Sequence, residues 1–366
     1  MALDDERLEQ IRMLRESAAA VADRRDLARS RAARFGLPGF SRPLWRQMAQ
    51  MGWLGLRLSP DQGGAGLGLA ELVALSEELG AALAPEPFVN ALMAVRLLEA
   101  EHLNAALAGE TISLAAWQET ARQLDDTEIE TTFIDGRVSG RKLYVPMAAG
   151  ADVFVVTTRQ GPAIVVAGDP RVNLHITPAQ DGGHWGTLTF EGARAVPGRA
   201  PQAGWFDEAV LATAGVLLGL IDAALERTLD FLTVRQQFGV KIGTFQALQH
   251  RAVDLKQQAL LTRASVEDAA AILDAAQGAA EGSAQAAAAK AAASRAKARA
   301  SAAALLVTRQ AIQLHGGIGY TDEHDIGLFL RKAMVLAPSL GDAAQHRHRF
   351  ARFQTLAAAS TQGQSA

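Results

Sequence analysis

The sequence contains no cysteine, few aromatic residues and no strong excess of charge of either sign. The absence of cysteine excludes disulfide bonds, thiolate zinc sites and a cysteine nucleophile. It also suits a reducing compartment, so we expect a cytoplasmic protein. The net charge of −3 gives no indication of a nucleic-acid partner.

Long apolar runs are missing as well. The longest, VLATAGVLLGLI, is shorter than a membrane-spanning helix requires, so we expect no membrane span. The N-terminal stretch MALDDERLEQIRMLRE has no apolar core and therefore does not resemble a secretory signal.

The 366 residues exceed what one hydrophobic core usually holds, so we expect two or three domains. Residues 1–111 space their apolar side chains as helices do. Residues 112–198 contain short β-branched runs, and Asp135-Gly136 predicts a hairpin turn between two of them. Residues 199–366 return to long helical patterns. Strands never alternate singly with helices, which argues against a doubly wound dinucleotide-binding fold.

Two basic clusters in the C-terminal region allow a functional interpretation that we do not favour. Lys290, Arg295, Lys297 and Arg299 lie in an alanine-rich helix, where we predict a solvated face rather than a site for an anion. The histidines of HRHR (346–349) alternate and so do not share a helical face, which predicts a surface position and no metal site.

The stretch RQQFGVKIGTFQ combines an arginine and an aromatic residue near a predicted helix end. Arg235 and Phe238 are three residues apart, so we expect them on one helical face, with Gly239 ending the helix. A guanidinium binds phosphate through two hydrogen bonds, and an adjacent ring can stack on a flat cofactor. Taken alone, such a pair more often forms a salt bridge and a core contact.

The stretch QLHGGIGY places glycines directly after a helical pattern. Backbone N–H groups at Gly316 and Gly317 can approach an anion closely, because no Cβ intervenes. Taken alone, the same glycines favour a helix C-cap followed by a turn.

Together, the two motifs resemble the signatures of the acyl-CoA dehydrogenase family, flavoproteins that desaturate acyl-CoA thioesters. The resemblance extends over nearly the whole chain. The stretch WLGLRLSPDQGGAGLGLAELVALSEELGAALAPEPF is similar to the N-terminal helical domain of the family, and GRKLYVPMAAGADVFVVTTR to the β segment that passes the flavin. The resemblance implies an α+β multidomain fold: an N-terminal helical domain (1–111), a central β domain (112–198) and a C-terminal four-helix-bundle-like domain (199–366).

The resemblance also implies FAD as the cofactor. In this family the two motifs reach the adenosine and pyrophosphate half of the FAD held by the neighbouring subunit. The positions that match these contacts are Arg235, Phe238, Gln246, Gln313, Gly316 and Gly317.

The catalytic base of the family has no direct counterpart. The reaction needs a carboxylate that removes the α-proton of the thioester while hydride leaves Cβ. Most members have this Glu at the position of Leu340, and a minority have it at the position of Ala209. Asp342 and Glu208 lie close to these positions and are our candidates for a relocated base.

The residues expected around the flavin ring also differ. The usual Trp-Ile-Thr triplet is Tyr144, Val145 and Pro146 here, and proline offers neither an N–H nor a hydroxyl. Trp117 and Gln118 lie where the family has a Thr-Glu-Pro segment, and they are candidate substitutes at the flavin.

The altered positions would serve the chain's own flavin ring and substrate, whereas the retained ones would serve a neighbour. LGDAAQHR (340–347) resembles the smaller subunit of heteromeric acyl-CoA dehydrogenases of the pimeloyl-CoA and steroid-side-chain type. We therefore favour a chain that works in a heterotetramer with a related, Glu-bearing subunit. A self-sufficient homodimer or homotetramer with a relocated base is the alternative.

Two further classes stay open at this point. One is a flavin monooxygenase or oxidase of the same α–β–α architecture, and the other is a scaffold subunit without flavin. For a dehydrogenase, the resemblance implies an acyl-CoA substrate and an electron-transfer flavoprotein as the electron acceptor.

Overall fold

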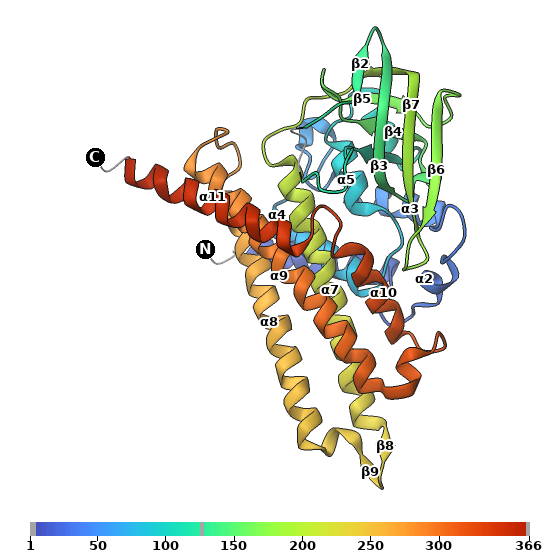
Figure 1. Ribbon diagram of the computed structural model, residues 1–366, viewed down its shortest axis with the longest axis vertical. Coiled ribbons are helices and arrows are strands. Elements are labelled where there is room, and N and C mark those ends of the chain that lie inside the picture. Colours follow the sequence, from blue (N-terminus) through green and yellow to red (C-terminus); the bar gives the residue numbers. More distant parts are fainter. Residues whose placement is uncertain (1–4, 125–127, 364–366) are drawn as a thin grey trace. The chain divides into compact units, whose positions relative to one another are not determined.

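The computed structural model describes residues 5–124 and 128–363 (Figure 1). Contacts within the backbone divide the chain into two compact units. We call them the helical unit (Met1–Ala28, Leu69–Ala84 and Val210–Ala366) and the sheet unit (Arg29–Gly68 and Pro85–Ala209). Each unit therefore combines segments that lie far apart in the sequence.

A seven-stranded sheet forms the centre of the sheet unit. Its strands follow the order β1-β4-β5-β7-β3-β2, and β6 pairs with β7. β1 and β4 run parallel, whereas the other described pairings in this sheet are antiparallel. The strands are β1 (Ser113–Ala116), β2 (Thr132–Ile134), β3 (Arg137–Pro146), β4 (Val153–Val156), β5 (Ala163–Val166), β6 (Val172–Pro178) and β7 (His184–Pro197).

The predicted hairpin between β2 and β3 is confirmed. Asp135 and Gly136 have φ angles of 50° and 70°, as a two-residue type I′ turn requires. The register Ile134↔Arg137 closes the turn directly.

Short helices complete the sheet unit. The Asn90 side chain in α5 donates to Ala115 O at 3.0 Å and accepts from Ala115 N at 2.8 Å, which fixes the helix against β1. The helices are α2 (Ala28–Ala32, at the boundary), α3 (Arg42–Gln50), α5 (Phe88–Val95) and α6 (Ala100–Leu107), with 3-10 turns η1 (Trp53–Gly55), η2 (Pro60–Gln62) and η3 (Ala148–Gly150).

The helical unit contains the long helices predicted for the C-terminal region, and Figure 1 shows α8 and α9 side by side. Its helices are α1 (Asp5–Val21), α4 (Leu69–Ala81), α7 (Trp205–Val234, within this unit from Val210), α8 (Gln246–Ala275), α9 (Ala284–His315), α10 (Ile326–Leu336) and α11 (Ala343–Gly363). Short elements join them: β8 (Gln236–Gln237), β9 (Val240–Lys241), η4 (Ile242–Thr244) and η5 (Gly316–Tyr320).

Helix α7 is more apolar than the sequence pattern suggested. By length and composition it alone among the described helices is able to cross a membrane. However, 83% of its apolar window is buried, as expected for the core helix of a folded domain.

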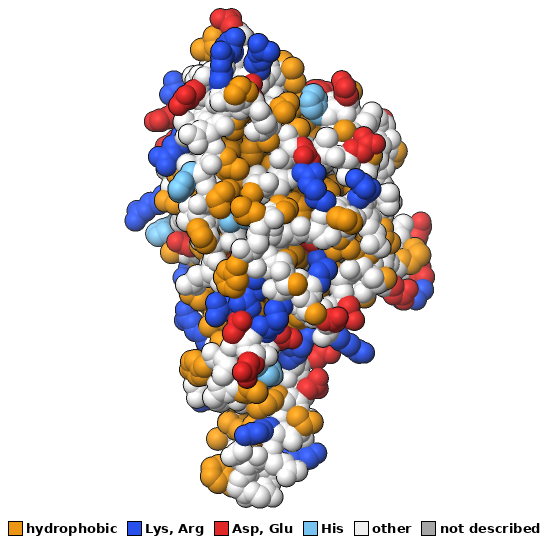
Figure 2. Space-filling model, turned by 90° about the vertical axis from the view of Figure 1, so that its right-hand side faces the viewer, with side chains coloured by type: hydrophobic (Ala, Val, Ile, Leu, Met, Phe, Trp, Pro, Cys, Tyr) orange, Lys and Arg blue, Asp and Glu red, His pale blue; other side chains and the backbone are white. Residues whose placement is uncertain are grey.

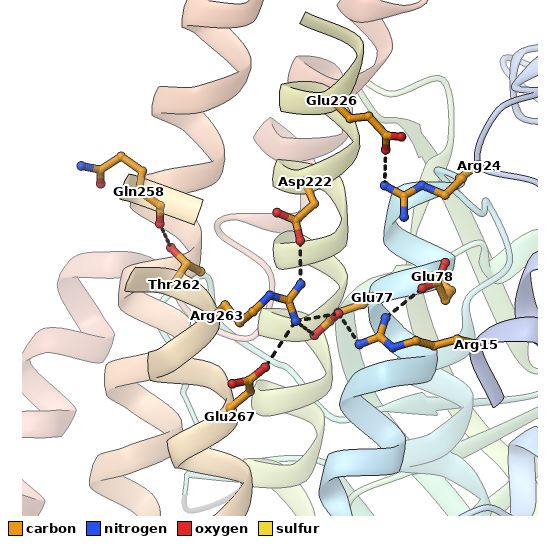
Figure 3. Close-up of polar contacts among 10 residues, drawn as sticks. All are labelled: Arg15, Arg24, Glu77, Glu78, Asp222, Glu226, Gln258, Thr262, Arg263 and Glu267. Carbon is orange, nitrogen blue, oxygen red and sulfur yellow. Dashed lines mark hydrogen bonds and ion pairs between the residues drawn. The ribbon is translucent and has the colours of Figure 1, made fainter. Parts of the chain in front are cut away.

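Buried carboxylates on α4 are neutralised by arginines from two other helices (Figure 3). Arg15 of α1 donates to Glu77 at 2.7 Å and to Glu78 at 2.8 Å. Arg263 of α8 contacts Glu77 at 3.2 Å and Asp222 of α7 at 2.6 Å. Burial raises the pKa of Glu77 although both arginines oppose the shift. The network joins α1, α4, α7 and α8 inside the helical unit.

Two predictions about the basic clusters are wrong. Lys297 is not on a solvated face, because its side chain is fully buried. His346 and Arg349 are likewise buried, and only the intervening Arg347 and His348 are exposed. At Lys297 the physical cause is that its small helical neighbours, Ala293 and Ser301, leave room for a long side chain inside the unit.

Candidate functional site

Helix α7 ends at Val234, earlier than the sequence suggested. The chain then forms a β8–β9 hairpin, in which Ile242 N donates to Arg235 O at 2.9 Å. Phe238 therefore does not share a helical face with Arg235, and that prediction is wrong. The physical reason is the pair Phe238-Gly239, whose φ angles of 53° and 79° form a type I′ turn.

Phe238 occupies a costly conformation for an exposed side chain. A left-handed backbone at a residue other than glycine costs about 1–2 kcal/mol. Its ring is nevertheless 92% exposed and touches Phe245 only edge-on, with ring centroids 6.2 Å apart. In Figure 2, apolar side chains reach the surface near the lower tip, where the hairpin lies. Neither core packing nor turn preference explains a phenylalanine here.

Arg235 and Gln246 flank the same hairpin. Both side chains are exposed, and Arg235 forms no ion pair within the described part of the chain. The salt bridge and core contact that the sequence left open are therefore not what this motif makes. A free guanidinium next to an exposed ring is a suitable site for a flat, anionic ligand.

The glycine loop follows α9 directly. Gly316 has a φ of 66° and a ψ of −144°, a conformation open essentially only to glycine. Gly319 packs so closely that an added Cβ would lie 2.7 Å from Ile312 O. Gly317 differs from both, because its φ is ordinary and an added Cβ would meet no atom within 4 Å. The fold itself does not require glycine at 317.

Three rings join the end of α7 to the end of α9. Phe231 stacks on His315, with centroids 4.3 Å apart and an interplanar angle of 24°. His324 lies 4.7 Å from His315 and 6.2 Å from Phe231. His315 Nδ1 contacts Ala311 O at 2.8 Å, which makes Nδ1 the protonated nitrogen. Burial lowers the pKa of His315 against the opposing effect of the hydrogen bond to Ala311, and the nearby His324 lowers it further.

The loop that contains Leu340 is held by two buried side chains. Leu340 and Gly341 both have left-handed backbones, with φ angles of 55° and 102°. Lys297 Nζ donates to Ala337 O at 2.8 Å and to Gly341 O at 3.0 Å. His346 Nε2 lies 2.9 Å from Leu340 O, to which it donates. The conformation at position 340 is thus fixed although its side chain carries no chemistry.

These two groups are buried without a carboxylate within hydrogen-bonding distance in the described chain. Burial lowers the pKa of Lys297 to about 7, against an opposing effect of Asp342. Burial, and then the charge of Lys297, lower the pKa of His346 to about 3. The sequence offered one signal for Lys297, since its helical neighbours Ala293 and Ser301 are both small.

Asp342 acts as the N-cap of α11. One carboxylate oxygen accepts from Ala344 N and from Gln345 N, each at 2.8 Å. The Gln345 side chain accepts in return from Asp342 N at 3.0 Å, which completes a capping box. One of the two carboxylate oxygens is therefore occupied by backbone donors.

Glu208, the other candidate base, lies in the sheet unit and faces two arginines. Its carboxylate is 3.0 Å from Arg57 and 3.4 Å from Arg96. All three side chains are at most 14% exposed. The neighbouring Ala209, at the alternative base position, is buried.

Tyr144 lies in a strained part of β3. Its φ is 56°, and the pairing with β7 shifts register between Lys142 and Val145. The ring is 46% exposed and meets Trp185 edge-on, with centroids 6.4 Å apart. Left-handed backbone and exposed aromatic surface at one point are typical of a functional position. The sequence pattern missed Trp185.

Trp117 is buried, and its ring packs edge-on against Phe206. Its carbonyl accepts from the buried Lys142 Nζ at 3.2 Å, and Glu119 accepts from the same nitrogen at 2.7 Å. Burial lowers the pKa of Lys142 to about 8, although Glu119 opposes the shift. The Gln118 side-chain amide donates a hydrogen bond to Thr120 O. Lys142 therefore ties this segment to β3, two residues before Tyr144.

Comparison with known proteins identifies the class of protein. The model of the acyl-CoA dehydrogenase N-terminal domain matches residues 8–100, and that of the C-terminal domain matches residues 200–354. The chain belongs to the acyl-CoA dehydrogenase family.

Individual relatives agree over most of their length. Acyl-CoA dehydrogenase IpdE2 of Mycobacterium tuberculosis is 31% identical over 333 residues, which cover 89% of this chain and 91% of that protein. IpdE2 of Mycolicibacterium smegmatis is 29% identical, with coverage of 93% and 97%. A solved variant of the Tcur3481-Tcur3483 steroid ACAD (acyl-CoA dehydrogenase) is 29% identical, with a TM-score of 0.83 and coverage of 96% and 99%. The expected fold class is confirmed.

Membership makes the chain an acyl-CoA dehydrogenase or a subunit of one, an oxidoreductase that acts on CH–CH donors with FAD as the cofactor. The helical unit fits part of such a dinucleotide, since it offers an unpaired guanidinium, an exposed ring and a glycine that the fold does not need. When bound, FAD supplies the hydride acceptor for desaturation.

Proposed function

We propose that this chain is the partner subunit of a heteromeric acyl-CoA dehydrogenase, whose catalytic carboxylate lies on a related chain. The observation that supports this most directly is the state of the two candidate bases. Asp342 is a helix cap, and Glu208 is paired with two arginines. A general base must be able to turn to the substrate and take up its proton. Both carboxylates already make structural contacts, which supports a base on another chain.

The retained residues support the same proposal from the other direction. Arg235, Phe238, Gln246, Gln313, Gly316 and Gly317 all have exposed positions in the helical unit. We propose that they contact the FAD of a neighbouring subunit. Phe238 and Gly317 support this most clearly, because the isolated chain offers no reason for either residue.

Around the chain's own flavin ring, fewer side chains are available to contact the cofactor. Tyr144 offers an exposed ring there, whereas Trp117 lies buried and contributes through its backbone carbonyl. We propose that Tyr144 is the aromatic residue of this segment that contacts the flavin. Trp117 would support it indirectly, through the hydrogen bond that its carbonyl accepts from Lys142.

For the substrate, we propose a bulky acyl-CoA thioester of the steroid-side-chain type. The similar Tcur3481-Tcur3483 protein is called a steroid ACAD, and its name pairs two proteins. We propose an electron-transfer flavoprotein as the electron acceptor and the cytoplasm as the compartment.

The test is to purify the chain alone and together with a co-expressed Glu-bearing paralogue. We expect the pair to copurify, to hold FAD and to turn over an acyl-CoA with an artificial electron acceptor. We expect the chain alone to show no turnover. Turnover by the chain alone that is abolished by Asp342→Ala or Glu208→Ala would instead establish the self-sufficient enzyme. A colourless pair would support the scaffold, and rapid oxygen consumption by the reduced flavin would support the monooxygenase or oxidase.

A further inference from the structure

The proposed FAD contacts come from two places in the sequence that must be held in register. One is the hairpin after α7, with Arg235 and Phe238. The other is the loop after α9, with Gly316 and Gly317. Both lie in the helical unit, so their relative position is a property of this one body.

The three-ring stack lies at the junction between these two segments. Phe231 O accepts the helical hydrogen bond from Arg235 N at 2.9 Å, so Phe231 is one turn before the hairpin. His315 is the residue immediately before Gly316. The near-parallel Phe231–His315 stack therefore connects the last turn of α7 to the first residue of the glycine loop.

The ring of His315 has a fixed orientation as well as a fixed place. Its Nδ1–H bond to Ala311 O, at 2.8 Å, limits rotation of the ring within α9. His324, which lies in the segment before α10, also packs against the His315 ring. An aliphatic side chain of equal volume would fill the space but would supply neither the flat face nor the oriented bond.

We propose that His315 is a positioning residue, whose ring, stacked on Phe231, holds the Gly316–Gly317 loop in register with the Arg235–Phe238 hairpin. The effect of His315 on FAD binding rests on the proposed function. Its geometric part concerns the chain alone and is testable without cofactor.

The geometric test uses the absence of cysteine. Paired Gln237→Cys and Ile318→Cys substitutions place two spin labels on exposed positions, one in the hairpin and one in the loop, with no background thiol. We expect a single narrow distance distribution in the otherwise unchanged chain. His315→Leu should broaden it, and His315→Phe, which keeps a flat ring, should not. A distribution unchanged by His315→Leu would overturn the proposal.

The cofactor test is a double-substitution cycle on FAD affinity, measured by flavin fluorescence on the chain copurified with its paralogue. An aromatic pair contributes enough to change an equilibrium constant about three- to tenfold. We expect His315→Leu and Phe231→Leu each to weaken FAD binding by about this factor. The double variant should be no weaker than either single variant, because both remove the same stack. His315→Phe should bind within about twofold of the unsubstituted complex.

The two tests separate the two ideas. If the unsubstituted complex binds no FAD, the proposed function fails, and the spin-label result still decides the role of His315. If FAD binds and the effects of the two leucine variants simply multiply, the positioning role fails while the proposed function stands. Unfolding midpoints of all variants show whether a loss is local or global.

Discussion

The Glu208 carboxylate lies 3.0 Å from the Arg57 guanidinium and 3.4 Å from that of Arg96. A pair buried to this extent is destabilised strongly when one charge is removed, because the other charge remains unpaired. The carboxylate thus has a structural role that competes with proton transfer.

Glu208→Gln should therefore affect stability and leave the chemistry of the assembled enzyme unchanged. Glutamine keeps the volume and one acceptor oxygen, so we expect a loss of about 1–3 kcal/mol in the free energy of unfolding. The pH dependence of kcat in the copurified complex should not shift. Denaturant titration and a pH–rate profile measure the two quantities. A loss of kcat by a factor of about a thousand or more, without unfolding, would make Glu208 a base after all.

The contrast between Gly317 and Gly319 gives a matched pair of substitutions. Gly317→Ala adds a methyl group into open space on an ordinary backbone, so we expect the unfolding midpoint to stay the same while FAD affinity falls. Gly319→Ala places its Cβ 2.7 Å from Ile312 O and should destabilise the chain itself. Unchanged FAD affinity in Gly317→Ala would mean that no ligand approaches this backbone.

Phe238 should show opposite effects on stability and on binding. Asparagine adopts a left-handed backbone at low cost, and Asn-Gly is a preferred type I′ turn. Phe238→Asn should therefore stabilise the chain by about 0.5–1 kcal/mol. The same change removes the exposed ring and should weaken FAD binding. Phe238→Leu is the control, since it keeps the strained backbone but loses the ring. It should weaken FAD binding without the gain in stability.

Much of the fold was open to prediction because local patterns decide it. The Asp135-Gly136 turn and the long helices of the C-terminal region follow from residues close together in the sequence. The end of α7 was missed because the local pattern there is misleading. Phe238 is a poor turn residue by its chemistry, so only the following glycine hinted at a hairpin.

In the candidate site, too, local features could be predicted and tertiary contacts could not. Arg235 and Gly316 were visible as motifs, whereas the contacts that hold them depend on tertiary packing. The stack of Phe231 on His315 and the burial of Lys297 join segments that no local pattern relates. The roles of the site residues and the three domain boundaries drawn from the sequence stay predictions.

Asp342 provides the second test of the missing base. The N-cap contributes about 1 kcal/mol, so Asp342→Ala should lower the free energy of unfolding by that amount. Asp342→Ser keeps a capping oxygen without a carboxylate and should restore most of the loss. We expect both variants to leave the pH–rate profile of the complex unchanged. An activity lost in both variants, with the cap restored in one, would identify a catalytic carboxylate.

Lys297 should make stability depend on alkaline pH. Its pKa is about 7 in the folded chain, below the ordinary value of 10.5. Between these pH values the unfolded chain binds a proton that the folded chain does not, so stability rises with pH across this window, by at most about 1.4 kcal/mol per pH unit. The contribution is lost as the pH falls toward 7. Lys297→Met should reduce this slope to the contribution of Lys142, whose pKa is about 8 in the folded chain. Lys290→Met, on the same helix with a partly exposed amine, should keep the full slope. Denaturant titrations at intervals from pH 7 to 10 measure the difference, and equal slopes in the two variants would show that Lys297 is charged throughout.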